Sequence, residues 1–163
     1  MSSMNRVNNL IDHSEFQQHL EKIEELERER KFCKHGFEHG LAVARIANAY
    51  LLEEGAGKLG REVVYAAALL HDIGRWVEYE TGKDHAEASA ELAAPILAAC
   101  GFAGTEIEMI AQGIREHRLR RQEGLSPLGQ ALALADDWAR DCRNCAARAD
   151  CYKFGDSMLR ITY

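Results

Sequence analysis

One segment restricts the fold of this chain more than any other: residues 63–70, with the sequence VVYAAALL. As a helix it is apolar around nearly its whole circumference, and such a helix has to be enclosed by other elements because it has no face to turn to water. We therefore expect a buried helix over about residues 61–71 at the centre of the molecule. His71 and Asp72 end this helix, although packing in an apolar core favours neither residue type.

Capping residues predict where most of the other helices begin. Four residues of the types that cap helix N-termini precede apolar runs at helical spacing, and a proline suits the first position of the last run. These residues are Ser14, Asp84, Thr105, Ser126 and Pro127. We expect helices over residues 14–31, 35–54, 61–71, 84–100, 105–117 and 128–142, with a polar connection through residues 81–83. Apart from the extreme end, no segment alternates convincingly between apolar and polar residues, so the predicted fold is all-α, with about six helices.

The length of 163 residues and the 47% content of hydrophobic residues fit one domain with one core. The chain has only two prolines and no Ser/Gly-rich stretch, so we find no linker in it. We expect a core over residues 32–140, an N-terminal helix over residues 14–31 and a cysteine-containing tail over residues 141–163.

Charge and hydropathy argue against two classes of partner, nucleic acids and membranes. A net charge of −6 provides no basic field for a nucleic-acid backbone. No apolar run approaches the roughly 20 residues of a membrane span, and the first 30 residues are polar and acidic, unlike a signal peptide. We therefore expect a cytoplasmic protein that binds neither nucleic acid nor membranes, and we leave its oligomeric state open.

Histidines fall on four different predicted helices, at His39, His71, His85 and His117. A single histidine on an apolar helix is most often a hydrogen-bonded structural residue, but this set is different because Asp136 also lies inside the apolar run of the last helix. A carboxylate in such a run is costly unless it is paired or bound to a cation. The pattern predicts a metal site.

These residues make the chain resemble the HD superfamily of metal-dependent phosphohydrolases. The pattern of that superfamily is a histidine, then His-Asp after an apolar helix, then a distant aspartate, and the resemblance spans residues 32–138. It implies an HD-domain helical bundle whose metal ligands are His39, His71, Asp72, His85, His117 and Asp136. His85 and His117 correspond to the additional histidines of the dinuclear branch, which place a second metal across Asp72.

The chemistry of these donors suits one or two divalent transition metals. Imidazole and carboxylate ligands bind Fe, Mn, Co, Ni or Zn, and donor softness alone does not choose among them. Two ions can activate a water and clamp a phosphoryl group between them.

Two positions leave alternatives open. His35 lies four residues before His39 and shares its helix face, so it is either a ligand or a partner of one; we favour His39 as the ligand. Asp137 points about 100° away from Asp136 around a helix, so only one of them faces the site, and the motif favours Asp136.

Arginines near the predicted ligands offer contacts to phosphate. The planar guanidinium binds phosphate oxygens at two points, which lysine does not reproduce. We assign substrate binding to Arg75, Arg115 and Arg118, and a catalytic role to Asp72 and Arg75. Arg120 and Arg121 receive no catalytic role. Glu78 and Glu116 are either a general acid or ordinary surface carboxylates, and we favour the second interpretation.

Cysteines at positions 142, 145 and 151 form a C-x2-C-x5-C pattern. Three thiolates are one short of a closed zinc or iron–sulfur site, and Cys33 can supply the fourth. The alternative is that Cys33, Cys142, Cys145 and Cys151 are free thiols of a reducing cytosol. Cys100 is more simply a small buried hydrophobe.

The predicted function is a metal-dependent phosphohydrolase that uses metal-activated water on a phosphate ester or anhydride of a small molecule. A nucleotide or dinucleoside polyphosphate is the substrate that the resemblance suggests. The alternative is a non-catalytic HD protein that binds metal or nucleotide and has a sensing or redox role. A purely structural helical adaptor is a third class, and it predicts no stoichiometric metal.

Overall fold

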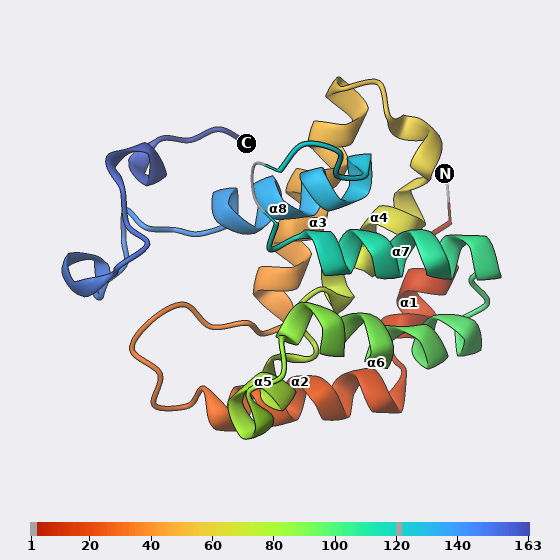
Figure 1. Cartoon of the computed structure of the whole chain (residues 1–163), viewed down its shortest axis with the longest axis horizontal. Coiled ribbons are helices and arrows are strands. Elements are labelled where there is room, and N and C mark those ends of the chain that lie inside the picture. Colours follow the sequence, from red (N-terminus) through yellow and green to blue (C-terminus); the bar gives the residue numbers. More distant parts are fainter. Residues whose placement is uncertain (1–2, 120–121) are drawn as a thin grey trace.

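A computed structural model describes residues 3–119 and 122–163, so Arg120 and Arg121 lie outside the described residues. Over these residues the chain forms eight α-helices, three short 3-10 helices and no strand, which confirms the all-α class (Figure 1). The α-helices are α1 (Asn5–Ile11), α2 (Ser14–Leu26), α3 (Phe37–Glu53), α4 (Arg61–Leu70), α5 (Arg75–Thr81), α6 (His85–Ala99), α7 (Gly104–Glu116) and α8 (Pro127–Trp138). The 3-10 helices are η1 (Gly57–Leu59), η2 (Arg148–Asp150) and η3 (Asp156–Leu159).

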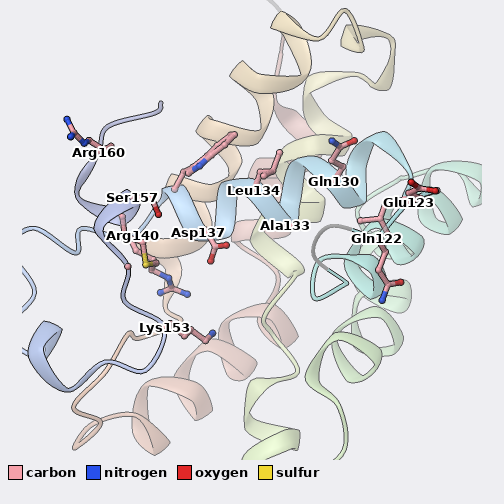
Figure 2. Close-up of a pocket in the computed structure, with 15 residues that line it drawn as sticks. Gln122, Glu123, Gln130, Ala133, Leu134, Asp137, Arg140, Lys153, Ser157 and Arg160 are labelled. Atoms are coloured by element: carbon pink, nitrogen blue, oxygen red, sulfur yellow. The ribbon is translucent and has the colours of Figure 1, made fainter.

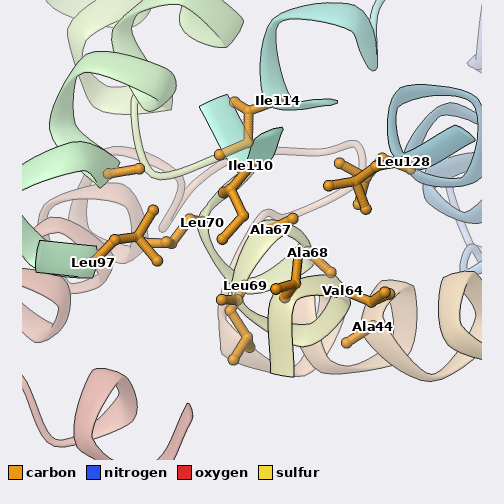
Figure 3. Packing of buried hydrophobic residues seen from close by; sticks show 14 of the residues in the cluster. Ala44, Val64, Ala67, Ala68, Leu69, Leu70, Leu97, Ile110, Ile114 and Leu128 are labelled. Atoms are coloured by element: carbon orange, nitrogen blue, oxygen red, sulfur yellow. The ribbon is translucent and has the colours of Figure 1, made fainter. Parts of the chain in front are cut away.

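Helix α4 is the central helix that its sequence predicted. It packs against α1, α3, α6, α7 and α8, and all its residues from Val63 to Leu70 except Tyr65 are buried. Figure 3 shows its leucines and alanines packed between Leu97 of α6, the isoleucines of α7 and Leu128 of α8. Enclosure on all sides is what an apolar surface of this extent requires.

Helices α1 and α5 were not among the six predicted. α1 is short and buries Val7 and Leu10 against the core. α5 occupies part of the stretch that we expected to connect two helices, and it ends at Gly82, whose φ of 78° is in the left-handed region that favours glycine. α5 packs on α2 and α6, and the indole N–H of Trp76 donates a hydrogen bond to Nδ1 of His19 over 3.1 Å. Because these contacts join segments that are far apart in the sequence, the residues around α5 show little local pattern that would predict the helix.

The predicted caps agree with the structure at two helices and differ at two. Asp84 accepts from the N–H groups of residues 86 and 87, and Ser126 accepts from that of residue 129. At α2 the cap is His13 rather than Ser14, because the ring of His13 accepts from the N–H of residue 15. Helix α7 begins at Gly104, ahead of Thr105, and the Glu106 carboxylate accepts from the N–H of residue 103.

The predicted ligands lie at or near the ends of five helices, and these ends determine the position of the functional site. His39 is in the first turn of α3 and His85 is the first residue of α6, whereas His71 and His117 directly follow α4 and α7. Asp136 is in the last turn of α8. Since α3, α4, α6, α7 and α8 pack on one another, their ends bring these residues together.

The chain from residue 139 onward leaves the helical bundle as an irregular tail, with the two short helices η2 and η3 (Figure 1). Within the described residues, no helix combines the length and apolar character needed to cross a lipid bilayer.

Candidate metal centre

Two groups of side chains meet where the helix ends converge. One ligand atom from each of His39, His71, Asp72 and Asp136 lies within 4.8 Å of the others, and the same holds for Asp72, His85 and His117. Asp72 belongs to both groups. The structure therefore brings together all six residues that the sequence singled out as ligands.

Backbone carbonyls orient two of the imidazoles. Nδ1–H of His71 donates to the carbonyl of Ala68, and Nδ1–H of His117 donates to the carbonyl of Ile114, both over 2.6 Å. Each carbonyl lies three residues earlier, in the last turn of the preceding helix. A proton on Nδ1 leaves the lone pair of Nε2 for coordination, which is the arrangement found at metal-binding histidines.

Short distances connect the inward-facing atoms. Nε2 of His39 lies 2.8 Å from Oδ1 of Asp136, and Nε2 of His85 lies 3.2 Å from Oδ1 of Asp72. The two histidines of the second group, His85 and His117, have their Nε2 atoms 3.3 Å apart. Two imidazole nitrogens at this separation, beside a carboxylate, suit a shared cation.

The protein leaves two buried polar atoms at the centre of the site without a hydrogen-bond partner. Nε2 of His71 and Oδ2 of Asp72 are fully buried, lie 3.0 Å apart and have no hydrogen-bond partner. Unpaired polar atoms are costly in a protein interior, and in native structures they call for an ion or a water. The donor set of imidazoles and carboxylates therefore fits a divalent metal, although it does not identify the element.

The pKa values of the buried histidines and aspartates depend on burial and on the charges of their neighbours. Burial disfavours the charged imidazole of His71, but the carboxylates of Asp72 and Asp136 outweigh burial and raise the pKa of His71 to about 10. Burial and the charge of His71 lower the pKa of His117 to about 4. Burial also acts against charge on the two carboxylates, yet the neighbouring histidines hold both of their pKa values well below the usual range. Two ionised carboxylates thus lie buried at the centre of the site, where a cation would be stabilised.

Glu78 supports the second group, although we favoured a surface role for it. Its Oε2 lies 2.9 Å from Nδ1 of His85, and the same carboxylate receives hydrogen bonds from Arg75 and Arg118. Burial acts against the charge of Glu78, but His85 and the arginines lower its pKa overall. Glu116, by contrast, accepts hydrogen bonds from the backbone and hydroxyl of Ser126, which ties the start of α8 to α7.

His35 belongs to neither ligand group. Its Nδ1 lies 2.5 Å from Oε1 of Glu27, and its backbone N–H donates to Oε2 of the same carboxylate over 2.7 Å. The hydroxyl of Tyr79 also donates to Glu27 over 2.5 Å. The ring of His35 meets that of His39 edge-on, with centroids 6.1 Å apart. His35 therefore packs against the candidate ligand His39 and is held in place by Glu27. The sequence carried no local signal for Glu27 or Tyr79.

The arginines lie at different distances from the centre. Nε of Arg75 donates to Oδ1 of Asp72 over 3.2 Å, and the side chain is largely buried. Arg118 pairs with Glu78 and Asp84 at the edge of the site. Arg115 instead forms an exposed ion pair with Glu87.

Arg140 also contacts a candidate ligand, Asp136, although we did not predict a role for it from the sequence. Its Nη2 donates to Oδ1 of Asp136 over 3.1 Å, and its Nη1 donates to the carbonyl of Lys34 over 3.0 Å. The spacing of four residues from Asp136 was the only signal that could have found it.

Two cavities lie beside the ligand groups: one is lined by Arg140, which contacts Asp136, and the other is lined by His39. One of about 780 Å³ lies between α8 and the tail, and its charged lining includes Asp137, Arg140, Lys153 and Arg160 (Figure 2). Asp137 thus faces a different space from Asp136. The other cavity, of about 910 Å³, is lined by His39, by five glutamates and by the cations Arg28 and Lys34. Its lining is therefore net acidic, whereas the cavity beside α8 has three cations against the carboxylates of Glu123 and Asp137.

Comparisons with known proteins agree with this geometry. Residues 36–141 match the family model described as HD domain, and the chain belongs to that family. It is 38% identical over 153 residues to an uncharacterized protein of Clostridium beijerinckii, a match that covers 94% of each chain. The crystal structure of a predicted HD superfamily hydrolase from an uncultured Thermotogales bacterium is similar with a TM-score of 0.56 and 30% identity. That match covers 75% of this chain and 66% of the other, slightly under two thirds of its length.

Proposed function

We propose that this protein is a metal-dependent phosphohydrolase that cleaves a phosphate ester or anhydride of a small molecule, with a nucleotide as the favoured substrate. The observation that carries the proposal is the environment of the Asp72 carboxylate. One buried carboxylate faces two groups of imidazoles, and its Oδ2 and the facing Nε2 of His71 have no hydrogen-bond partner. Membership of the HD family and the similarity to a predicted HD superfamily hydrolase support a hydrolytic reaction.

The two ligand groups assign the metal-binding residues. His39, His71, Asp72 and Asp136 would hold one ion, and Asp72, His85 and His117 a second. When bound, such ions lower the pKa of a water molecule and polarise the phosphoryl oxygens. The protein holds its imidazoles ready for coordination through the carbonyls behind His71 and His117 and through Glu78 behind His85.

Arg75 is the residue that we assign to the phosphoryl group. Asp72 and Glu78 hold its guanidinium in one orientation beside the shared carboxylate, so little side-chain entropy is lost when a phosphate binds. Arg118 shares Glu78 with Arg75 and provides a second positive charge at the edge. The substrate-binding role of Arg115 stays a prediction from the sequence, and its pairing with Glu87 supports it less well.

Charge favours one of the two cavities for the organic part of the substrate. The cavity beside α8 has a volume within the range of roughly 300–1,000 Å³ that is common for small-molecule sites. Arg140 lines it and also contacts Asp136, so it adjoins the first ligand group. The cavity beside α2 is lined by five glutamates against two cations, Arg28 and Lys34, and this excess of negative charge would repel a phosphorylated molecule.

The test is hydrolysis by the protein loaded in turn with Mn, Fe, Co, Ni or Zn, followed by inorganic phosphate release and by chromatography of the nucleotide products. The substrate panel contains nucleoside mono-, di- and triphosphates, dinucleoside polyphosphates and a generic aryl phosphate. We expect turnover that depends on metal and is absent in Asp72→Asn. Stoichiometric metal without hydrolysis of any substrate would overturn the proposal and favour a non-catalytic, sensing protein.

A further inference from the structure

Four cysteines from two distant segments gather at one place beside the helical bundle. Cys33 lies in the connection between α2 and α3, and Cys142, Cys145 and Cys151 lie in the tail after α8. Figure 1 shows the connection and the tail extending on the same side of the helices. Cys33, Cys142 and Cys145 line one cavity of about 340 Å³. All four thiols are half-buried, and none of them is in a disulfide.

The contact between the two segments extends to the fourth cysteine. Nζ of Lys31, two residues before Cys33, lies 2.5 Å from Oδ2 of Asp150, which directly precedes Cys151. Nη1 of Arg140 donates to the carbonyl of Lys34, so a second bond joins the segments on the other side of Cys33. Residues separated by more than 100 positions are thus brought together around the thiols.

We propose that Cys33, Cys142, Cys145 and Cys151 form a four-thiolate centre for a soft transition metal, either a single zinc ion or an iron–sulfur cluster. Four cysteine sulfurs are the ligand set that zinc and iron–sulfur clusters share. This centre shares no ligand with the imidazole and carboxylate site, although His39 lines the same cavity, and it does not depend on the function proposed above.

The backbone of the tail holds its three cysteines in successive turns. The N–H of Cys145 donates to the carbonyl of Cys142, and the N–H of Cys151 donates to the carbonyl of Arg148. The N–H of Arg148 in turn donates to the carbonyl of Cys145. A C-x2-C turn allows both thiols to reach one metal, as in structural zinc sites. The fold of this segment thus follows the spacing of its cysteines rather than an apolar pattern.

The electrostatic surroundings suit an anionic centre. Within three residues of these cysteines the sequence has seven lysines or arginines and only two aspartates, in a chain whose net charge is −6. They are Arg30, Lys31, Lys34, Arg140, Arg143, Arg148 and Lys153, against Asp141 and Asp150. Four thiolates around a zinc ion or an oxidised cluster carry excess negative charge, which these cations offset.

The surroundings of the Cys142 thiol disfavour its ionisation in the absence of a metal. Burial raises the pKa of the Cys142 thiol, and its three neighbours Cys33, Cys145 and Cys151 raise it further. A metal cation removes this mutual repulsion when it displaces the thiol protons.

The two kinds of centre differ in how closely they hold their sulfurs. Zn–S bonds of about 2.3 Å place tetrahedral thiolates about 3.8 Å apart. Among the described residues, the groups of three or more ligand atoms within 4.8 Å of one another consist of histidines and aspartates, and the cysteines form none. A single zinc ion would therefore have to draw the metal-free thiols closer together, whereas a cluster of several irons holds its thiolates farther apart.

The experiment uses full-length wild-type protein purified without oxygen. We expect iron together with acid-labile sulfide for a cluster. For a single ion we expect zinc without sulfide that His71→Ala retains and Cys142→Ser loses, because the imidazole site can also bind zinc. Protein stripped of metal and titrated with cobalt(II) should show thiolate-to-cobalt charge-transfer absorption, which imidazole and carboxylate ligands do not produce. The sulfide and cobalt measurements on wild-type protein do not depend on any variant folding.

Variants separate this centre from the imidazole site. Cys142→Ser and Cys145→Ser should lose the sulfide or the charge-transfer band, whereas the control Cys100→Ala and the ligand variant His71→Ala should keep it. Wild-type protein with neither sulfide nor a thiolate-to-cobalt band would overturn the proposal. Because His71→Ala affects only the other site, failure of the phosphohydrolase proposal and failure of this one are distinguishable.

Discussion

Nε2 of His85 lies 3.2 Å from Oδ1 of Asp72, whereas Nε2 of His71 approaches the other oxygen of the same carboxylate. Asp72 therefore has one oxygen toward each ligand group. A carboxylate in this position can bridge two cations, and its loss affects both sites where the loss of a histidine affects one.

Metal stoichiometry should follow this division. We expect Asp72→Asn to lose all metal from the centre, and His117→Ala to lose one of two ions, because His117 belongs only to the second group. The measurement is elemental analysis of purified protein, expressed per chain after subtraction of metal bound by the cysteines. Asp137→Asn is the matched control and should keep both ions, since Asp137 is in neither group. Full metal content in Asp72→Asn would contradict the bridging role.

Metal binding should release a proton at neutral pH. Without metal the pKa of His71 is raised to about 10, so its imidazole is protonated at pH 7, and coordination requires the neutral ring. The apparent affinity should rise by about tenfold for each pH unit between about 7 and 10 through this group. Calorimetry in buffers of different ionisation enthalpy measures the proton count. Metal binding without proton release would show that His71 is already neutral.

The raised pKa of His71 also makes the stability of the metal-free protein depend on pH. The pKa of an unfolded histidine is near 6.5, so the raised pKa of His71 contributes stability that is fully present below about pH 6.5 and lost as pH rises through about 10. Thermal unfolding of metal-stripped protein between pH 7 and 10 should show this decline. In His71→Gln this part of the pH dependence should disappear.

Arg75→Lys tests the phosphate contact. Lysine keeps the charge but loses the planar two-point geometry, and we expect kcat/KM to fall by about 10²-fold, the order of magnitude for loss of one donor to transition-state charge. Arg115→Lys, whose parent side chain pairs with exposed Glu87, should change it little. Steady-state kinetics on the best substrate of the panel compares the two. Equal effects would remove Arg75 from the site.

Gly74 should not tolerate a side chain. A Cβ there would lie 2.5 Å from the backbone nitrogen of Ser89 and 2.8 Å from the carbonyl oxygen of His85. We expect Gly74→Ala to lower the free energy of unfolding by about 1–3 kcal/mol, and to shift α6 with its ligand His85. Gly104→Ala is the control, since nothing lies within 4 Å of its added Cβ. Thermal denaturation of both variants, with metal content alongside, measures the difference.

Much of the fold follows from local patterns. The apolar run before His71 requires a buried helix wherever it lies, and Asp84 and Ser126 cap their helices through contacts within three residues. The candidate ligands were also visible, because a charged or imidazole group at the end of an apolar segment is conspicuous without any neighbour.

The supporting residues could not be found in this way. Tyr79 reaches Glu27 across 52 positions of sequence, and Glu78 contacts His85 only because α5 folds back on α6. The choice of His39 over His35, and of Asp136 over Asp137, likewise depends on which side chain faces the packed helix ends. Periodicity describes which face of a helix is apolar, whereas the partners of a polar group depend on contacts between distant segments, which only the folded chain brings together.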